Sequence, residues 1–234
     1  MWTREELKTS AKTALKANYW RSVGAGLLMT VAVGGVAASS RASTDEEEVA
    51  AIFQNAVDDF GMDLIVKVMV AIIASVLVVS LISTLIKIFL MNPLYAGCNK
   101  FFINSLEQGG EPLVIVSWPL KNNYLKNVGT LFLRNLFVSL WSLLLVVPGI
   151  IKSYEYRMVS YILVDQPELS RKEVFALSKK MMQGNKWAAF VLDLSFIGWN
   201  ILAAITLNIV GIFYVMPYYQ HTNAALYLKL KGQI

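Results

Sequence analysis

Long apolar segments alternate with shorter polar segments along most of this chain. Apolar runs with few charges occupy residues 19–39, 64–90, 128–147, 187–207 and 209–227. A helix of about 20 apolar residues crosses the hydrocarbon core of a bilayer. The pattern therefore predicts an all-α, polytopic helical membrane protein with amphipathic helices on its surface.

A sixth span is predicted over residues 150–164, although its composition is poor for one. Its charged residues are Lys152, Glu155 and Arg157. If this stretch did not return through the membrane, the five bases of residues 171–186 would lie outside the cell, against the positive-inside rule. We therefore expect a hairpin that turns at Pro148-Gly149, giving about six transmembrane helices with both termini cytoplasmic. A shallow re-entrant hairpin keeps the same sidedness and is the alternative.

The charges are sorted by sign along the chain. Residues 40–63 hold seven of the sixteen acids and one base, whereas the first 21 residues hold five bases. Basic connections face the cytoplasm in membrane proteins. We expect residues 1–234 to form one domain of the cytoplasmic membrane, in which 40–63 is an acidic extracellular loop and 94–127 and 165–186 are cytoplasmic.

Both cytoplasmic segments carry helix signals. Residues 94–106 have the pattern of a helix, and we interpret 94–127 as an interfacial segment. Ser170 and Glu173 have the spacing of a capping box, and Gly184 is placed to end the helix that they begin.

Residues 1–18 are predicted to form an amphipathic helix that begins with a capping box at Thr3 and Glu6. Leu7 and Leu15 belong to its apolar face. The bases that recur every four residues, and would contact anionic lipid headgroups, are Arg4, Lys8, Lys12 and Lys16. Such a helix lies on the cytoplasmic membrane surface. The alternative is a helix packed on the cytoplasmic face of the protein itself.

Composition narrows the class further. The chain of 234 residues is 56% hydrophobic and 16% charged, whereas soluble domains are about 25% charged. Cys98 and His221 are the only residues of their types, which excludes an internal disulfide and a histidine-rich metal site. The net charge is +5, and the basic residues lie next to the apolar segments. We therefore expect lipid headgroups, and not nucleic acid, as partners. The sequence lacks phosphate-binding glycine loops and metalloprotease motifs, so we expect no cofactor and no enzymatic activity.

Asp193 is the costliest residue for membrane insertion. It falls within the 187–207 segment, where an acid costs about 2.5–3.5 kcal/mol at the helix centre. We expect a buried charge network in which Lys152 or Arg157 is its partner and Glu155 completes the set. Such a network either serves as a proton, ion or headgroup site or is an ion pair that orders the bundle. Ser195 lies only two residues from Asp193 on the helix and faces nearly the opposite side, which argues against a catalytic triad with His221.

The last apolar segment contains a proline followed by polar side chains. A proline in mid-span frees backbone carbonyls, which polar groups then satisfy, or which line a cavity. The candidate cavity-lining residues are Pro217, Tyr218, Gln220, His221 and Asn223. A kinked, partly hydrated helix is the alternative.

Several motifs resemble one known family. They are LKANYW (15–20), NPLYAG (92–97), LWSLLLVVPGIIKSY (140–154), YILVDQPELS (161–170), SKKMMQGNKW (178–187), LDLSFIGWNIL (192–202) and VMPYYQHTNAALY (215–227). The chain resembles the bacterial integral membrane proteins grouped as domain of unknown function 975, found chiefly in Gram-positive bacteria. At a distance it also resembles the membrane domain of some glycerophosphodiester phosphodiesterases. The resemblance implies a polytopic helical fold without an established activity.

Two functions follow from these expectations. The first is a non-enzymatic membrane protein that acts through lipids or a membrane protein partner, as a scaffold, an accessory subunit or an envelope-stress or immunity-type factor. The alternative is a small transporter or lipid-handling protein with a path near the Pro148-Gly149 hairpin and the 209–227 segment. A cavity containing Asp193, Lys152 and His221 would favour transport, and a closed bundle would favour the first function.

Overall fold

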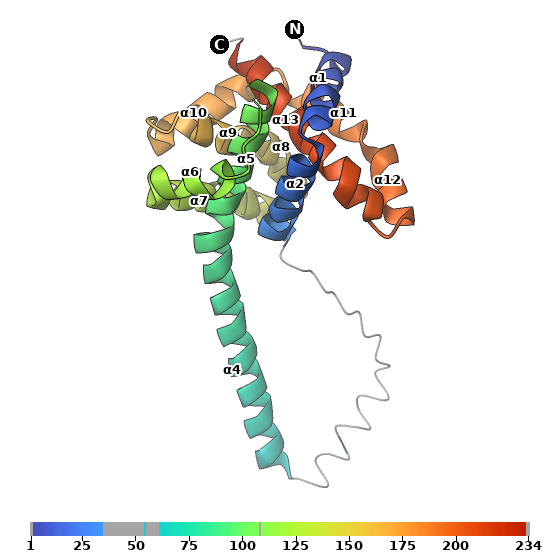
Figure 1. The fold of residues 1–234 in the computed structure, drawn as a ribbon. Coiled ribbons are helices and arrows are strands. Elements are labelled where there is room, and N and C mark those ends of the chain that lie inside the picture. Colours follow the sequence, from blue (N-terminus) through green and yellow to red (C-terminus); the bar gives the residue numbers. More distant parts are fainter. Residues whose placement is uncertain (1, 35–53, 55–60, 108, 233–234) are drawn as a thin grey trace. The chain divides into compact units, whose positions relative to one another are not determined.

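The computed structural model describes residues 2–34, 54, 61–107 and 109–232, and every regular element within these ranges is helical (Figure 1). The predicted all-α class is confirmed. The chain divides into two compact units, one made of Met1–Gly35 with Ile88–Ile234 and the other of Val36–Lys87.

The described part of the smaller unit is dominated by helix α4 (Met62–Ile86). Its side chains are apolar on all faces, which is the composition of a helix surrounded by lipid. Asp63 and Lys67 form an ion pair of 2.6 Å in its first turns. The π-helical turn η1 (Lys87–Met91) follows. Apart from Gln54 and residues 61–63, the predicted acidic loop at 40–63 lies outside the described residues.

Helix α5 (Asn92–Glu107) forms the centre of the larger unit. Phe101, Phe102 and Ile103 are consecutive and fully buried, because α5 has neighbours on several sides. These neighbours are α2 (Tyr19–Gly34), α6 (Val114–Lys121), α9 (Val159–Asp165) and α13 (Met216–Lys231). The helix predicted at 94–106 is therefore present, and it packs in the core of the larger unit. The interfacial position of 94–127 stays a prediction.

Glycine allows α5 and α6 to approach each other closely. A Cβ atom at Gly97 would lie 2.7 Å from the carbonyl carbon of Ile115 and 2.9 Å from its Cα. Real side chains do not reach such distances, so this contact requires a residue without a Cβ.

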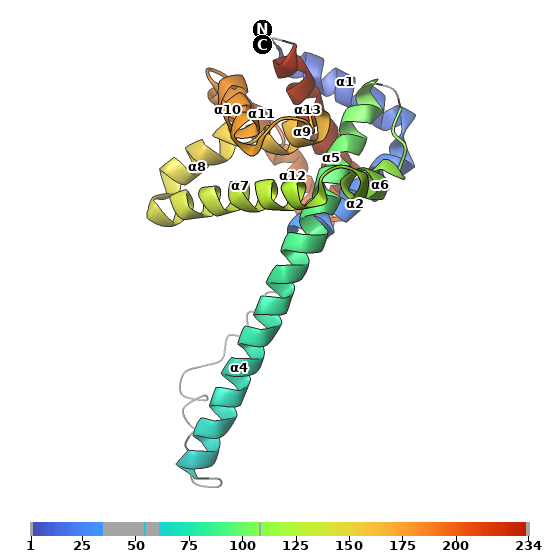
Figure 2. The same ribbon diagram turned by 90° about the vertical axis from the view of Figure 1, so that its left-hand side faces the viewer.

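Helices α7 (Tyr124–Leu144) and α8 (Val146–Glu155) lie side by side as a hairpin (Figures 1 and 2). The turn falls at Leu145, whose backbone is extended (φ −156°, ψ 136°), and not at Pro148-Gly149. Pro148 is the third residue of α8, where a backbone N–H has no partner within the helix. Gly149 faces α7, where a Cβ would lie 2.6 Å from the Cα of Ser142. The predicted hairpin is present, but the prediction that this dipeptide breaks the helix is wrong.

Helix α8 ends at Glu155 and α9 begins at Val159, so three residues interrupt the segment predicted as a span.

Helix α10 (Arg171–Met182) confirms two local predictions, one at its start and one beyond its end. It begins with the complete capping box, in which Ser170 N donates to the Glu173 carboxylate at 2.7 Å. Gly184 has the left-handed φ of +77° expected beyond the end of this helix.

Helices α11 (Lys186–Leu194) and α12 (Ile197–Ile205) are separated by a short break, and a reverse turn follows them. Leu207 and Asn208 have positive φ angles of 49° and 66°, which agrees with the tight turn implied between the last two apolar segments. A π-helical turn η2 (Gly211–Val215) comes directly before α13 and accommodates Pro217 at its start.

The N-terminal helix α1 (Arg4–Ala17) packs on α13 at the same end of the larger unit (Figures 1 and 2). Leu7, Ala11 and Leu15 are buried there, and Glu6 forms an ion pair with Lys229. The apolar face of α1 is therefore packed on the protein, as in the alternative. Contact of the basic stripe with anionic lipid headgroups stays a prediction.

The basic stripe of α1 is divided between solvent and protein. Arg4, Lys12 and Lys16 are exposed. Lys8 is half-buried, with its ammonium 4.8 Å from the centre of the Phe196 ring. This burial lowers the pKa of Lys8, and the charges of Arg4 and Lys12 add to the effect.

Three helical stretches among the described residues are long and apolar enough to cross a membrane. They are Met62–Glu107, Tyr124–Leu144 and Lys186–Ile205. The segments predicted at 150–164 and 209–227 are not among these stretches, and α2 is described only as far as Gly34.

Candidate functional site

Asp193, near the end of α11, forms a two-pronged ion pair with Arg157. Arg157 Nη1 lies 2.7 Å from Asp193 Oδ2, and Arg157 Nη2 lies 2.7 Å from Oδ1. Such paired, parallel hydrogen bonds are among the strongest that a carboxylate makes. Arg157 reaches Asp193 because it lies in the break between α8 and α9, where the chain leaves the helical path.

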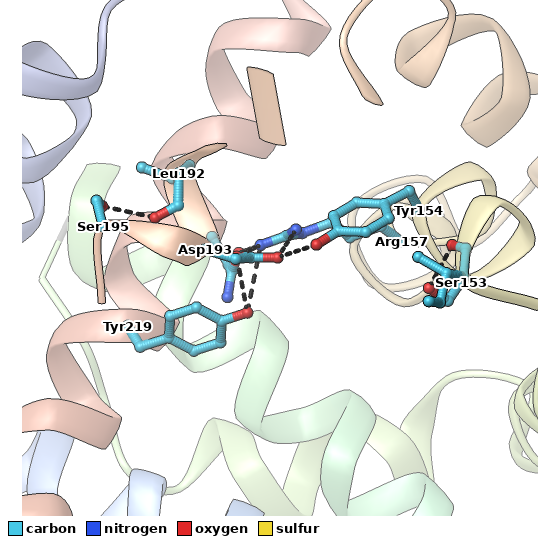
Figure 3. A network of polar contacts seen from close by, with 9 residues as sticks. Ser153, Tyr154, Arg157, Leu192, Asp193, Ser195 and Tyr219 are labelled. Atoms are coloured by element: carbon cyan, nitrogen blue, oxygen red, sulfur yellow. Dashed lines mark hydrogen bonds and ion pairs between the residues drawn. The ribbon is translucent and has the colours of Figure 1, made fainter. Parts of the chain in front are cut away.

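Two tyrosines complete the environment of this carboxylate (Figure 3). The Tyr154 hydroxyl donates to Oδ2 at 2.7 Å, and the Tyr219 hydroxyl donates to Oδ1 at 3.1 Å. Arg157 also donates to the side-chain oxygen of Asn223 on α13. Each oxygen of Asp193 thus has two donors, so its hydrogen-bonding capacity is largely used within the protein. This geometry fits the interpretation of an ion pair that orders the bundle.

Glu155 belongs to a second, separate cluster. Lys152 and Lys186 lie 3.1 Å from its carboxylate, and Lys179 lies at 3.7 Å. The single network of Lys152, Glu155, Arg157 and Asp193 that we predicted is thus divided in two. The physical reason is that α8 ends at Glu155, so helical spacing does not continue to Arg157.

A cavity of about 390 Å³ lies beside Asp193. Its polar lining includes Asn200, Asn208 and Gln220, and Ala203, Ile212 and Val215 are among its apolar lining residues. This combination suits a small ligand with one polar group. Neither Lys152 nor His221 contributes to the lining. In the described ranges, no group of three or more His, Cys, Asp or Glu side chains is arranged to hold a metal ion.

Only Gln220 among the predicted lining residues contacts this cavity. Pro217, Tyr218, His221 and Asn223 lie in the packed interior instead. His221 Nε2 lies 2.9 Å from Ser22 Oγ, and its ring packs on Phe102. Pro217 and His221 are four residues apart, so they share the helix face that is buried in the protein.

The sequence interpretation missed Tyr154, Tyr219, Asn200 and Asn208. The two asparagines had a usable signal, because amide side chains within an apolar helical segment are costly unless they are hydrogen-bonded or face a cavity. The tyrosines carried no such signal in the sequence, since tyrosine is common in apolar segments near membrane interfaces.

Asp165, at the end of α9, holds the last turns of α13. Its carboxylate accepts hydrogen bonds from Tyr227 at 2.7 Å and Lys231 at 2.6 Å, and Lys100 lies at 3.9 Å. Partial burial opposes ionisation. The hydrogen bonds from Lys231 and Tyr227 outweigh it, with help from the charges of Lys231 and Lys100, and hold the pKa of Asp165 below its ordinary value.

Among the described residues every regular element is helical, and three stretches are long and apolar enough to cross a membrane. This composition is consistent with an integral membrane protein. Residues 136–233 match the family described as protein of unknown function (DUF975). This match confirms the family resemblance over a segment that includes Tyr154, Arg157, Asp193 and Tyr219. No curated protein and no solved structure matches the chain, and the likeness to glycerophosphodiester phosphodiesterases receives no support from these comparisons.

Proposed function

We propose that the chain is a multi-pass protein of the bacterial cytoplasmic membrane, with about six spans and both termini cytoplasmic, that acts through lipids or a membrane protein partner. It would serve as a scaffold, an accessory subunit or an envelope-stress or immunity-type factor and not as an enzyme. The observation that carries this proposal is the environment of Asp193. Its carboxylate accepts hydrogen bonds from Arg157, Tyr154 and Tyr219, an arrangement that supports an ordering role for this ion pair.

Exposed apolar side chains support a membrane environment and a partner within it. Leu143 and Leu144 at the end of α7 are 87% and 72% exposed, and Leu207 in the turn after α12 is 88% exposed. Clustered apolar surface of this kind is normally covered by lipid or by another protein.

Site-specific photocrosslinking in cell membranes tests this proposal. A photoreactive residue at Leu143 or Leu207 is expected to give a discrete adduct with another membrane protein. The same residue at Lys172, which is exposed on α10, serves as the control. The chain should also stay in the membrane pellet after alkaline extraction. Release by alkali would overturn the proposed membrane location. Adducts with lipid alone at both positions would overturn the proposal of a protein partner.

A lipid-handling or small transport function is the second candidate, favoured by the cavity beside Asp193. Its volume falls in the range typical of small-molecule sites, and its polar groups converge from α11, α12 and α13. No residue of the α7–α8 hairpin contributes to the lining of this cavity. In this second candidate function, the transport path therefore runs along α12 and α13. Transfer of labelled lipid between liposomes that is lost on Ala203→Phe would favour it. Absence of transfer by the wild-type protein would count against it.

A further inference from the structure

A second hollow lies where α10 ends and α11 begins. It has a volume of about 760 Å³ and includes Lys179, Lys180, Lys186 and Trp187 in its lining, together with Glu155. None of these residues contacts the cavity beside Asp193.

The hollow carries an excess of positive charge. Three lysines and one glutamate line it, which leaves a formal charge of +2. Lys152, which lies outside the lining, also pairs with Glu155, so this carboxylate is shared among several ammonium groups. The side chains of Lys179 and Lys186 are 49% and 36% exposed and therefore remain accessible to a ligand.

The start of α11 adds to the attraction for an anion. The first N–H groups of a helix have no partner within it and carry partial positive charge. Asn185, at the capping position, makes no side-chain hydrogen bond to these groups. Its side chain instead accepts from Trp2 Nε1 at 3.1 Å and donates to the carbonyl of Met181 at 3.1 Å.

The position of the hollow identifies the source of the anion. Lys186 is the first residue of the stretch Lys186–Ile205, which is long and apolar enough to cross a membrane. Trp187 follows it and is 72% exposed. Lysine and tryptophan at the end of a spanning helix lie at the level of the lipid headgroups.

We infer that this hollow binds the phosphate of an anionic phospholipid headgroup through Lys179, Lys180 and Lys186, with Trp187 beside the upper part of the acyl chains. This inference specifies the class of lipid that the proposed membrane protein binds, and it rests on that proposed function. Phosphatidylglycerol is a suitable probe because its headgroup presents a phosphodiester and no compensating positive charge.

Binding of phosphatidylglycerol to the purified full-length protein in neutral detergent tests the inference. The variant K179Q/K180Q/K186Q is expected to bind roughly 100-fold more weakly, since each base near an anionic surface contributes about a factor of five. The variant K121Q/R171Q/K172Q removes the same charge from exposed positions outside the hollow and should bind like the wild type. Replacing the three site lysines by arginine should retain binding.

The single variant Lys180→Gln tests the site without risk to folding, because Lys180 makes no ion pair within the described structure. It should weaken binding about fivefold without changing the helical content. Equal losses in the two triple variants would show general charge attraction and overturn the site. Inorganic phosphate that displaces the lipid at low millimolar concentration would assign the site to free phosphate and overturn the lipid source.

Membrane extraction separates the two proposals. A chain that resists alkaline extraction but binds phosphatidylglycerol and phosphatidylcholine equally would overturn this inference and leave the membrane function standing. A chain that alkali releases would overturn both.

Discussion

At the scale of single residues, stability depends on how the buried Glu155 and the partly buried Asp193 are paired. Asp193 is satisfied by one guanidinium and two hydroxyl groups, whereas Glu155 is surrounded by lysines only. Removing one member of a buried pair leaves the other charge without compensation, and that cost exceeds the net value of the pair. The two clusters should therefore respond independently to substitution.

Asp193→Asn and Arg157→Gln should each lower the free energy of unfolding by about 3–5 kcal/mol. The double variant should lose less than the sum, because neither partner is then left charged and unpaired. Chemical unfolding in detergent measures these differences. Lys152→Gln combined with Asp193→Asn is the control and should be additive, since Lys152 pairs with Glu155. Additivity in the Asp193–Arg157 pair would contradict the assignment.

Asp165 gives a pH-dependent prediction. Its pKa in the folded protein lies below its ordinary value, so its stabilising effect is present at neutral pH and disappears as the pH falls through that lowered pKa. Asp165→Asn should cost about 1.5–3 kcal/mol at pH 7, through weaker hydrogen bonds to Tyr227 and Lys231. Thermal unfolding across pH should show the two proteins converging below about pH 4. A difference that persists unchanged to pH 3 would exclude this role.

At the scale of helices, local signals were predictable from sequence and the packing of helices was not. The capping box at Ser170 and the end of α10 at Gly184 follow from the residues themselves. The burial of α5 does not, because Phe101 and Ile103 could equally face lipid in an apolar helix. Likewise, Pro148-Gly149 resembles a helix break, but proline fits a first turn and Gly149 serves contact with α7.

Gly97→Ala should destabilise the larger unit, because the added methyl group would meet the backbone of Ile115 at 2.7–2.9 Å. We expect a loss of about 1–3 kcal/mol, as for other overpacked sites. Gly198→Ala on α12 is the matched control, since a Cβ there has no neighbour within 4 Å. It should be neutral or stabilising by up to about 1 kcal/mol. Thermal unfolding of both variants decides the point, and equal effects would refute the close contact.

At the scale of the whole molecule, the apolar runs and the sorting of charges made the helical class predictable. The candidate site was predictable only in part. The cost of burying Asp193 pointed to a partner, and Arg157 was one of two candidates. The hydroxyl donors and the separate lysine cluster could not be foreseen, because they depend on how α8, α10, α11 and α13 pack against one another.

Sidedness in the membrane can be measured by cysteine labelling. In a Cys98→Ala background, Asp63→Cys should react with an impermeant thiol reagent from outside the cell. Lys179→Cys should react only after the membrane is opened, because the basic segment 165–186 is expected on the cytoplasmic side. Both positions are exposed at the protein surface. External labelling at Lys179 would contradict the proposed six-span topology.

The contact between the first and last helices has a consequence for how the chain is made. The buried face of α1 is covered by α13, which begins only at residue 216. At about 5–20 residues per second, the ribosome needs roughly 10–40 s to synthesise the residues between α1 and α13. During this time Leu7, Ala11 and Leu15 lack their final cover, so a ribosome stalled before α13 would leave a nascent chain that quality-control proteases can recognise at its very first helix.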